Sequence, residues 1–327
     1  NAIGAIWSSS SPDFGVSSVI DRFSQIEPKI LIAADGYQYN GKSYDKINDI
    51  RSIKASISSL EQVVLIPFIN DSVEGLDENW LSWTTCLNQP DSELTFNRVP
   101  FEHPIWVLYS SGTTGIPKAI TQSQGGILLE HLKYLSLHAN IKPGERCFWF
   151  TTTGWMMWNY IQASWLAGGT LVLYEGSPAY PDLNVLWRFT EEVGINHFGT
   201  SAGFITANMK TGLNPMADFD ISSLISVGST GSPLPPEAFS WIYNNIGANI
   251  WLTSISGGSD VCTAFVGGVP TLPVRKGEIQ ARALGCSLYA LDDQEHKVVG
   301  SLGEMVSDQP MPSMPGFFWN DPGNERY

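Results

Sequence analysis

The residues at positions 110–118 combine the chemical groups that a triphosphate requires in a binding site. The run is Ser110, Ser111, Gly112, Thr113, Thr114, Gly115, Ile116, Pro117 and Lys118. Its glycines let the backbone approach an anion, its hydroxyls can donate hydrogen bonds, and its lysine supplies positive charge. It is not a Walker A loop, because Lys118 follows Pro117 and no Ser or Thr comes next. The pattern predicts a phosphate-binding loop of another type; a flexible Ser/Gly turn with a solvated lysine is the alternative.

Strands and helices alternate around this loop. A short, bulky apolar run at 105–109 predicts a strand buried on both faces directly before it. After it, apolar residues at helical spacing predict a helix that ends near Lys142, Pro143 and Gly144. Further strands are predicted at 147–150, 171–174, 224–227 and 250–253, and helices at 184–193 and 236–245. The fold class is therefore α/β, with mainly parallel sheets flanked by helices.

The two ends of the chain have a different character. The first hundred residues contain a βα unit at 5–22 and a strand at 63–66, followed by a polar stretch at 70–97 that predicts a surface excursion or boundary. The last fifty residues have Gly, Pro and short alternating runs, which predict the start of a small antiparallel or β-barrel-like segment. We expect three parts: 1–100, a nucleotide and acyl-binding part at 101–272, and a β-rich segment at 273–327.

Composition excludes several classes of protein. With 43% apolar residues and 12 Trp, the chain of 327 residues can build a large core. Eighteen basic against 32 acidic residues give a net charge of -14, which argues against nucleic acid or anionic lipid as partners. No apolar run is long enough to span a bilayer. The four cysteines are far apart and form no CxxC pair, so we expect reduced thiols in a cytoplasmic protein.

The phosphate-binding loop resembles the signature of the adenylate-forming (AMP-binding, acyl-CoA synthetase) superfamily. Four further segments, at 151–159, 229–234, 254–260 and 276–282, are similar to those of the acetoacetyl-CoA synthetase family. The resemblance implies the αβαβα layers of the superfamily's large N-terminal domain. It also implies that this chain is a fragment of that domain, with the C-terminal domain, the ribose-binding Asp and the adenylation Lys beyond Tyr327.

The resemblance assigns roles to individual residues. It implies that ATP is held by Ser110, Ser111, Gly112, Thr113, Thr114, Gly115, Lys118, Gly231, Ser232, Pro233, Ser254, Ile255, Ser256, Gly257, Gly258 and Ser259. Lys118, Thr113 and Asp260 take the catalytic roles, and Asp260 helps to hold Mg. Ser256, Ser259 and Asp260 depart from the family's aromatic, Thr and Glu, although Ser keeps a hydroxyl and Asp keeps carboxylate oxygens. An ordinary strand-to-helix connection with Ser232 starting the helix, and a tight turn at 257–260, are the alternatives.

The acyl pocket is implied to involve Trp155, Met156, Met157, Thr230 and Gly257. Acetyl-CoA synthetases have a Trp at the position that matches Gly257, so a glycine there predicts a deeper pocket and an acid larger than acetate. Methionine suits an irregular apolar cavity, but Met156 and Met157 fit an ordinary core equally well.

The implied reaction is activation of a short-chain carboxylate, acetoacetate before others, by ATP, followed by transfer to CoA. No general base is needed for a carboxylate that is ionised at neutral pH, so none of the five histidines is expected to be catalytic. Without a C-terminal domain, we expect this chain alone to be inactive. The alternatives are an acetyl-, propionyl- or butyryl-CoA ligase and, from another class, an inactive nucleotide-binding pseudoenzyme or truncated product.

Overall fold

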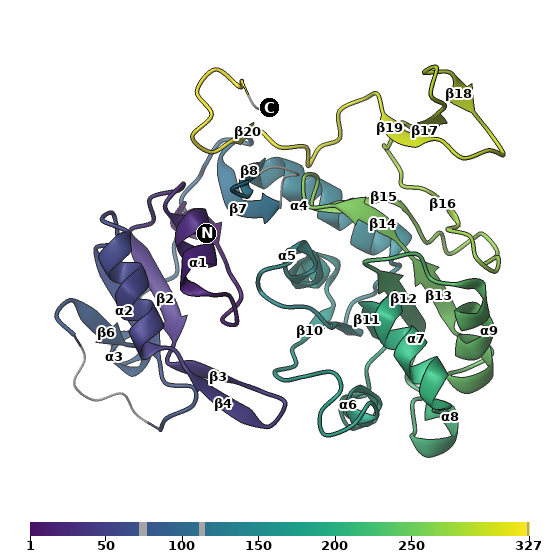
Figure 1. The fold of residues 1–327 in the computed structure, drawn as a ribbon, viewed down its shortest axis with the longest axis horizontal. Coiled ribbons are helices and arrows are strands. Elements are labelled where there is room, and N and C mark those ends of the chain that lie inside the picture. Colours follow the sequence, from purple (N-terminus) through teal and green to yellow (C-terminus); the bar gives the residue numbers. More distant parts are fainter. Residues whose placement is uncertain (72–76, 111–114, 326) are drawn as a thin grey trace. The chain divides into compact units, whose positions relative to one another are not determined.

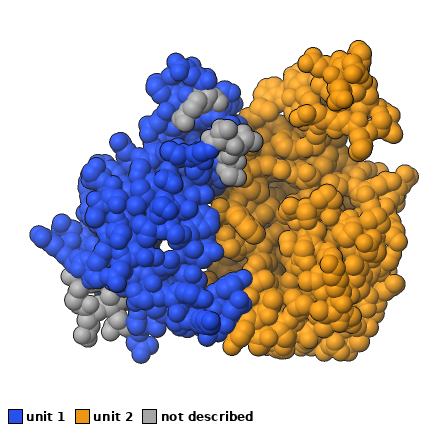
Figure 2. Space-filling view, in the orientation of Figure 1, with its two compact units in different colours: residues 1–123, 315–327 blue, residues 124–314 orange. Residues whose placement is uncertain are grey.

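The computed structural model describes residues 1–71, 77–110, 115–325 and 327. The chain divides into two compact units, which Figure 2 shows in different colours. Unit 1 contains residues 1–123 and 315–327, and unit 2 contains residues 124–314. The functional parts expected at 1–100, 101–272 and 273–327 do not coincide with these units and remain predictions.

The described residues of unit 1 form two larger sheets and the two-stranded antiparallel sheet β3-β4. The first has the strand order β1-β7-β8-β20, in which β8 is antiparallel to both of its neighbours. The second is the parallel sheet β2-β5-β6. The elements of unit 1 are β1 (Trp7–Ser8), α1 (Val16–Phe23), β2 (Ile30–Ala34), β3 (Gly36–Tyr39), β4 (Lys42–Asp45), α2 (Ile47–Ser56), β5 (Gln62–Ile66), β6 (Trp80–Ser82), α3 (Trp83–Leu87), β7 (Pro104–Ser110), β8 (Lys118–Ser123) and β20 (Phe317–Phe318).

Unit 2 is built on a five-stranded, fully parallel sheet of order β10-β9-β11-β12-β13. The elements of unit 2 are α4 (Gln124–Lys133), the π-helix η1 (Tyr134–His138), β9 (Arg146–Trp149), α5 (Met156–Gln162), the 3-10 helix η2 (Ala163–Ala167), β10 (Thr170–Val172), α6 (Val185–Val193), β11 (His197–Ser201), α7 (Ala202–Thr211), α8 (Pro215–Asp218), β12 (Ser226–Thr230), α9 (Pro236–Asn245), β13 (Trp251–Ser254), β14 (Ser256–Gly258), β15 (Thr263–Gly267), β16 (Ala281–Arg282), β17 (Leu288–Leu291), β18 (Lys297–Val298) and β19 (Glu304–Ser307).

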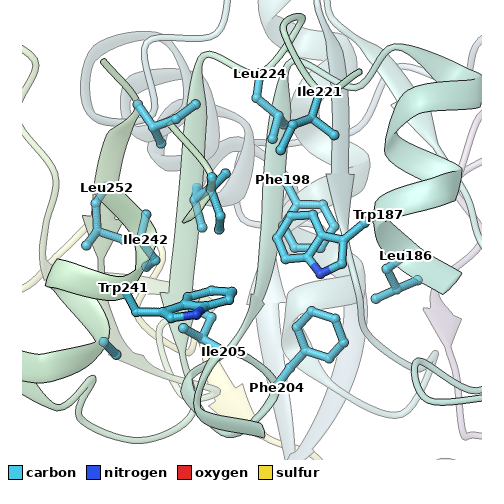
Figure 3. Packing of buried hydrophobic residues seen from close by; sticks show 14 of the residues in the cluster. Leu186, Trp187, Phe198, Phe204, Ile205, Ile221, Leu224, Trp241, Ile242 and Leu252 are labelled. Carbon is cyan, nitrogen blue, oxygen red and sulfur yellow. The ribbon is translucent and has the colours of Figure 1, made fainter. Parts of the chain in front are cut away.

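One face of the five-stranded sheet packs against helices α6, α7 and α9. Phe198, Val227 and Leu252 point to this face from neighbouring strands, and Figure 1 shows α7 and α9 beside β11 to β13. The indole of Trp187 stacks on the ring of Phe198, with centroids 4.8 Å apart (Figure 3). Its Nε1 donates to Oδ1 of Asn208 at 2.8 Å, which satisfies the polar atom that burial would otherwise leave unpaired.

The opposite face of the sheet packs against η1, α5 and the strands β14 and β15. Its buried cluster contains Tyr134, Met157 and Tyr160, with the ring of Tyr134 stacked on His138 at 4.9 Å. Successive residues of a strand point to opposite faces, so each strand of the sheet contributes side chains to both buried clusters.

The fold class predicted from the sequence is confirmed, as are most of the predicted elements. Several strands were not predicted, among them β2 in unit 1, β8 directly after the phosphate-binding loop and β11 in the five-stranded sheet. The predicted helix does not directly follow the phosphate-binding loop, because β8 intervenes and pairs with β7 and β20. Strand β11 has the sequence HFGTS, with Phe198 as its one bulky apolar residue and Gly199 at its centre, which weakens its sequence signal. Near the C-terminal end, β17, β18 and β19 form an open antiparallel sheet, while β20 returns to unit 1.

The carboxylate of Asp35 is buried and hydrogen-bonded within unit 1. Its hydrogen bonds predict that unit 1 loses stability in acid. The carboxylate accepts hydrogen bonds from the backbone N–H groups of Phe68, Ile69 and Asn70 and from the amide of Asn70. Burial favours the neutral acid, but the hydrogen bonds outweigh it and lower the pKa of Asp35. The stabilisation is therefore present above the unfolded-state pKa of about 4 and is lost as the pH falls through the lowered folded-state pKa.

We expect Asp35→Asn to lower the free energy of unfolding of unit 1 by about 1–3 kcal/mol at neutral pH and to flatten its loss of stability in acid. Urea unfolding at several pH values measures both effects. Asp21→Asn, which changes an exposed carboxylate on α1, is the matched control. Equal unfolding of the two variants at neutral pH would contradict the prediction.

Candidate active site

The phosphate-binding loop connects two antiparallel strands of unit 1. Ser110 ends β7 and lies opposite Lys118, the first residue of β8. Ser111, Gly112, Thr113 and Thr114 lie outside the described residues. Gly115 has φ +95°, a left-handed conformation that favours glycine, and a Cβ at this position would meet nothing within 4 Å. The pairing of β7 with β8 therefore brings both ends of the loop to one point.

Two contacts hold the second half of this loop within unit 1. The amide Nε2 of Gln25, just after α1, donates to the carbonyl oxygen of Pro117 at 2.9 Å. The side chain of Lys118 is exposed, and its Nζ lies 5.3 Å from the ring centre of Phe318 on β20. An aromatic face attracts a cation at this distance without neutralising its charge. The exposed ammonium group of Lys118 thus lies near the ring of Phe318 at the end of the loop.

A second group of predicted residues lies at the carboxyl ends of β12 and β13 in unit 2. Thr230 ends β12, and Gly231, Ser232 and Pro233 are exposed in the connection to α9. Helix α9 begins at Pro236, so Ser232 does not start it. Gly231 has φ +88°, which allows the chain to turn directly after the strand.

The structure brings this turn next to the segment 254–256. Thr230 Oγ1 donates to the carbonyl oxygen of Ile255 at 3.0 Å, and the N–H of Ile255 donates to the carbonyl of Ser229 at 2.9 Å. Ser254, which ends β13, pairs with Ser229. Ligands of open α/β sheets bind at such carboxyl ends, because the connections there diverge and leave a crevice. Predicted residues that are more than twenty positions apart in sequence are therefore neighbours.

Ser259 and Asp260 lie in the connection between the antiparallel strands β14 and β15. The N–H of Cys262 donates to the carbonyl of Ser259 at 3.3 Å, so the segment is also a tight turn. Asp260 is exposed. Carboxylate oxygens suit a hard divalent cation, although within residues 1–71, 77–110 and 115–325 no three His, Cys, Asp or Glu side chains form a metal-ligating cluster.

Gly257 has a structural reason to be glycine that the sequence did not reveal. It sits at a bulge in β14, and a Cβ there would lie 2.0 Å from the carbonyl oxygen of Thr263 and 2.6 Å from the Cα of Ala264. Both atoms belong to the backbone of β15 and cannot rotate away. The residue is therefore required by the pairing of β14 with β15, whatever its effect on pocket depth.

The residues predicted to line an acyl pocket differ in exposure. Trp155 precedes α5 and is 57% exposed, whereas Met157 is 8% exposed and belongs to the buried cluster under the sheet. Met156 packs against the same cluster. Burial in the core favours the alternative of ordinary packing for Met157, while Trp155 remains open to solvent.

A cavity of about 40 Å³ lies on the η1 and α5 side of the five-stranded sheet. Its lining includes Trp149, Gly228, Thr253 and Ile255, and also the hydroxyl-bearing Tyr134. The Tyr134 hydroxyl is buried and has no hydrogen-bond partner among the described residues. Sequence analysis missed this cavity, although glycine within the short strands β11 and β12 is a known signal of close side-chain or backbone approach.

Two of the five histidines, His131 and His138, form buried hydrogen bonds with the backbone. His131 donates from Nε2 to the carbonyl of Cys262 at 2.7 Å, and burial lowers its pKa to about 4. His138 accepts from the N–H of Leu284 at Nε2, so its Nδ1 carries the hydrogen and donates to the carbonyl of Gly268. Burial also lowers the pKa of His138. Both rings are thus uncharged at neutral pH, and they join separate parts of the backbone through hydrogen bonds.

Comparison with known families identifies the class to which this fold and site belong. A family described as "AMP-binding enzyme" matches residues 1–318, and the chain therefore belongs to that family. The resemblance found in the sequence is confirmed. No helix among the described residues is both long and apolar enough to cross a membrane.

The two relatives and the solved structure that follow are all acetoacetyl-CoA synthetases. The chain is 45% identical to the acetoacetyl-coenzyme A synthetase of Rhizobium meliloti (strain 1021) and 40% identical to the acetoacetyl-CoA synthetase of Gallus gallus, in each case over 100% of this chain and 50% of the relative. The solved structure of acetoacetyl-CoA synthetase from Streptomyces lividans matches with a TM-score of 0.95 at 48% identity, again over 100% of this chain and 50% of the other. The chain spans about half the length of these relatives.

The geometry at Gly257 predicts a difference between two adjacent glycines. We expect Gly257→Ala to lower the free energy of unfolding by about 1–3 kcal/mol, because β14 and β15 must separate to admit the methyl group. Gly258→Ala is the matched control, since a Cβ there meets nothing closer than 3.8 Å. Thermal unfolding of both variants measures the difference. Equal stability of the two would show that the bulge does not require glycine.

Proposed function

We propose that this chain provides the nucleotide and acyl-binding part of an acetoacetate-CoA ligase. The reaction joins acetoacetate to AMP, with release of pyrophosphate from ATP, and then transfers the acyl group to CoA. The observation that carries the proposal is the contact of Thr230 with Ile255, which joins two predicted ATP-binding segments at the carboxyl edge of the parallel sheet. The similarity to acetoacetyl-CoA synthetases along the whole chain supports the choice of acid.

The residues have distinct proposed roles in the first step. Ser110, Lys118 and the hydroxyls of Thr113 and Thr114 hold the phosphates, since cationic and N–H or O–H donors strengthen as negative charge develops. Gly231, Ser232 and Pro233 form a wall for the adenine ring. Ser254, Ile255, Ser256, Gly258 and Ser259 complete the contact with the nucleotide.

Positioning is the main catalytic contribution in this proposal. The carboxylate of the acid attacks the α-phosphorus, and both reactants are anions, so bringing them together and offsetting their charge lowers the barrier. Asp260 would hold Mg through its carboxylate oxygens, which suit a hard divalent cation. When bound, Mg supplies charge neutralisation at the phosphates.

The acyl pocket and the transfer to CoA are the remaining parts of the proposal. Trp155, Met156, Met157, Thr230 and Gly257 are the proposed pocket residues, with Met157 the weakest member because it is buried in the core. Transfer to CoA rests on the similarity to acetoacetyl-CoA synthetases alone. The proposed cytoplasmic location rests on the spacing of the cysteines.

Lys118 gives a direct test of the phosphate-binding role. In the full-length protein, Lys118→Ala should lower ATP-pyrophosphate exchange with acetoacetate by about a hundredfold or more, the effect of removing one charge-stabilising donor. Lys142→Ala changes an exposed lysine of unit 2 and should leave the rate unchanged. Exchange that survives in the Lys118 variant would remove this residue from the mechanism.

A panel of acids tests the proposed substrate. We expect kcat/KM in ATP-pyrophosphate exchange to be highest for acetoacetate, with acetate, propionate and butyrate lower, because one methylene changes binding by about 1–3 kcal/mol and a keto oxygen adds a polar contact. Succinate serves as a control for acid specificity. A clear preference for acetate would replace the proposal with acetyl-CoA ligase. ATP binding without exchange for any acid would favour the inactive nucleotide-binding protein.

A further inference from the structure

One row of residues crosses four strands of the five-stranded sheet in unit 2. Trp149 on β9 pairs with Gly199 on β11, Gly199 pairs with Gly228 on β12, and Gly228 pairs with Thr253 on β13. Residues in register across a parallel sheet point to the same face. This face is the one that carries the cavity, because Trp149, Gly228 and Thr253 all line it.

The indole of Trp149 occupies the space that the two glycines leave empty. A Cβ on Gly199 would lie 2.0 Å from Cε3 of the indole, and a Cβ on Gly228 would lie 2.8 Å from its Cη2 and Cζ3. The ring therefore lies across both glycines. Its other neighbour is Tyr160 of α5, which packs edge to face with centroids 6.0 Å apart. Backbone on one side and an aromatic ring on the other hold the indole in place.

This row lies two residues from the proposed active site along the strands, toward their amino ends. Thr230 follows Gly228 by two residues on β12, so it points to the same face about 7 Å further toward the carboxyl end. Ile255, which follows Thr253 by two residues, accepts the hydrogen bond from Thr230. His197 and Ser226 precede Gly199 and Gly228 by two residues on their strands. They line the cavity toward the amino ends of the strands. The indole thus lies between the proposed site and the deeper lining.

We propose that Trp149 is the floor of the acyl subsite and determines the length of acid that the site accepts. The proposal rests on the proposed function. An acid whose carboxylate lies at the carboxyl edge, near Thr230, extends its tail down the sheet toward the indole. One row spacing of about 7 Å accommodates only a few carbon atoms beyond the carboxylate. Aromatic and apolar surface then meets the end of a short chain and excludes a longer one.

The position of the floor also explains how a pocket can lack a side chain at Gly257 and still be short. In this structure a side chain at Gly257 would run into the backbone of β15, so that position does not supply the floor here. An indole from β9 does so instead, at a site that requires Gly199 and Gly228. Trp149 is therefore a specificity-determining residue, and it takes no part in the chemistry at phosphorus.

The test uses the full-length protein and the variants Trp149→Leu and Trp149→Phe. ATP-pyrophosphate exchange gives kcat/KM for acetoacetate, butyrate, hexanoate and octanoate, and titration with ATP reports nucleotide binding. We expect Trp149→Leu to raise the ratio of hexanoate to acetoacetate by at least tenfold, and Trp149→Phe to raise it less, with ATP affinity unchanged in both. Trp165→Leu, which replaces a 65% exposed Trp in η2, is the matched control and should leave the ratio unchanged.

The outcomes separate this proposal from the proposed function. If the variants keep the wild-type ratio, or lose all four acids equally while still binding ATP, Trp149 does not set acid length and the inference is overturned. Acetoacetate activation by the wild type would still support the proposed function in that case. If Trp149→Leu fails to bind ATP, Trp149→Phe decides by the same criterion. A wild type that binds ATP and activates none of the acids overturns both proposals.

Discussion

The two glycines on one face of the five-stranded sheet are the constraint on which the rest of this site depends. Gly199 and Gly228 are paired on neighbouring strands, and the indole of Trp149 lies across both. The residues next to them, Phe198 and Val227, point to the opposite face and join the core beneath α6, α7 and α9. Because side chains alternate along a strand, one face can be filled to stabilise the sheet while the other keeps room for a cavity.

The same sheet explains why residues far apart in sequence act together. Parallel strands end at a common edge, so the segments that follow β12 and β13 meet there, and the bond from Thr230 to Ile255 fixes their spacing. The phosphate-binding loop is built differently. It joins two antiparallel strands in unit 1, and the pairing of Ser110 with Lys118 holds its ends together. The antiparallel connection in unit 1 and the parallel-strand connections in unit 2 therefore each hold a different predicted ATP-binding segment.

Gly257 illustrates how a missing side chain can be misinterpreted. From the sequence, a glycine where acetyl-CoA synthetases have a Trp suggests that an indole has been removed from the pocket. In the structure, the bulge in β14 directs the missing Cβ into the backbone of β15, so no side chain could stand there without moving a strand. Pocket depth therefore depends on what neighbouring strands contribute, and Trp149 on β9 is the clearest contributor.

The sequence by itself determined the class of fold, the strands β5, β7, β9, β10, β12 and β13, the helices α4, α6 and α9, and the family, because these depend on local periodicity and on contiguous motifs. Residues 110–118 and 254–260 could be identified without coordinates for that reason. Only the tertiary structure decided that β8 follows the loop, that Met157 is core, and that Trp149 covers Gly199 and Gly228. Those features depend on strand register and on which face a side chain occupies. Register joins residues that are distant in the chain, and no local pattern encodes it.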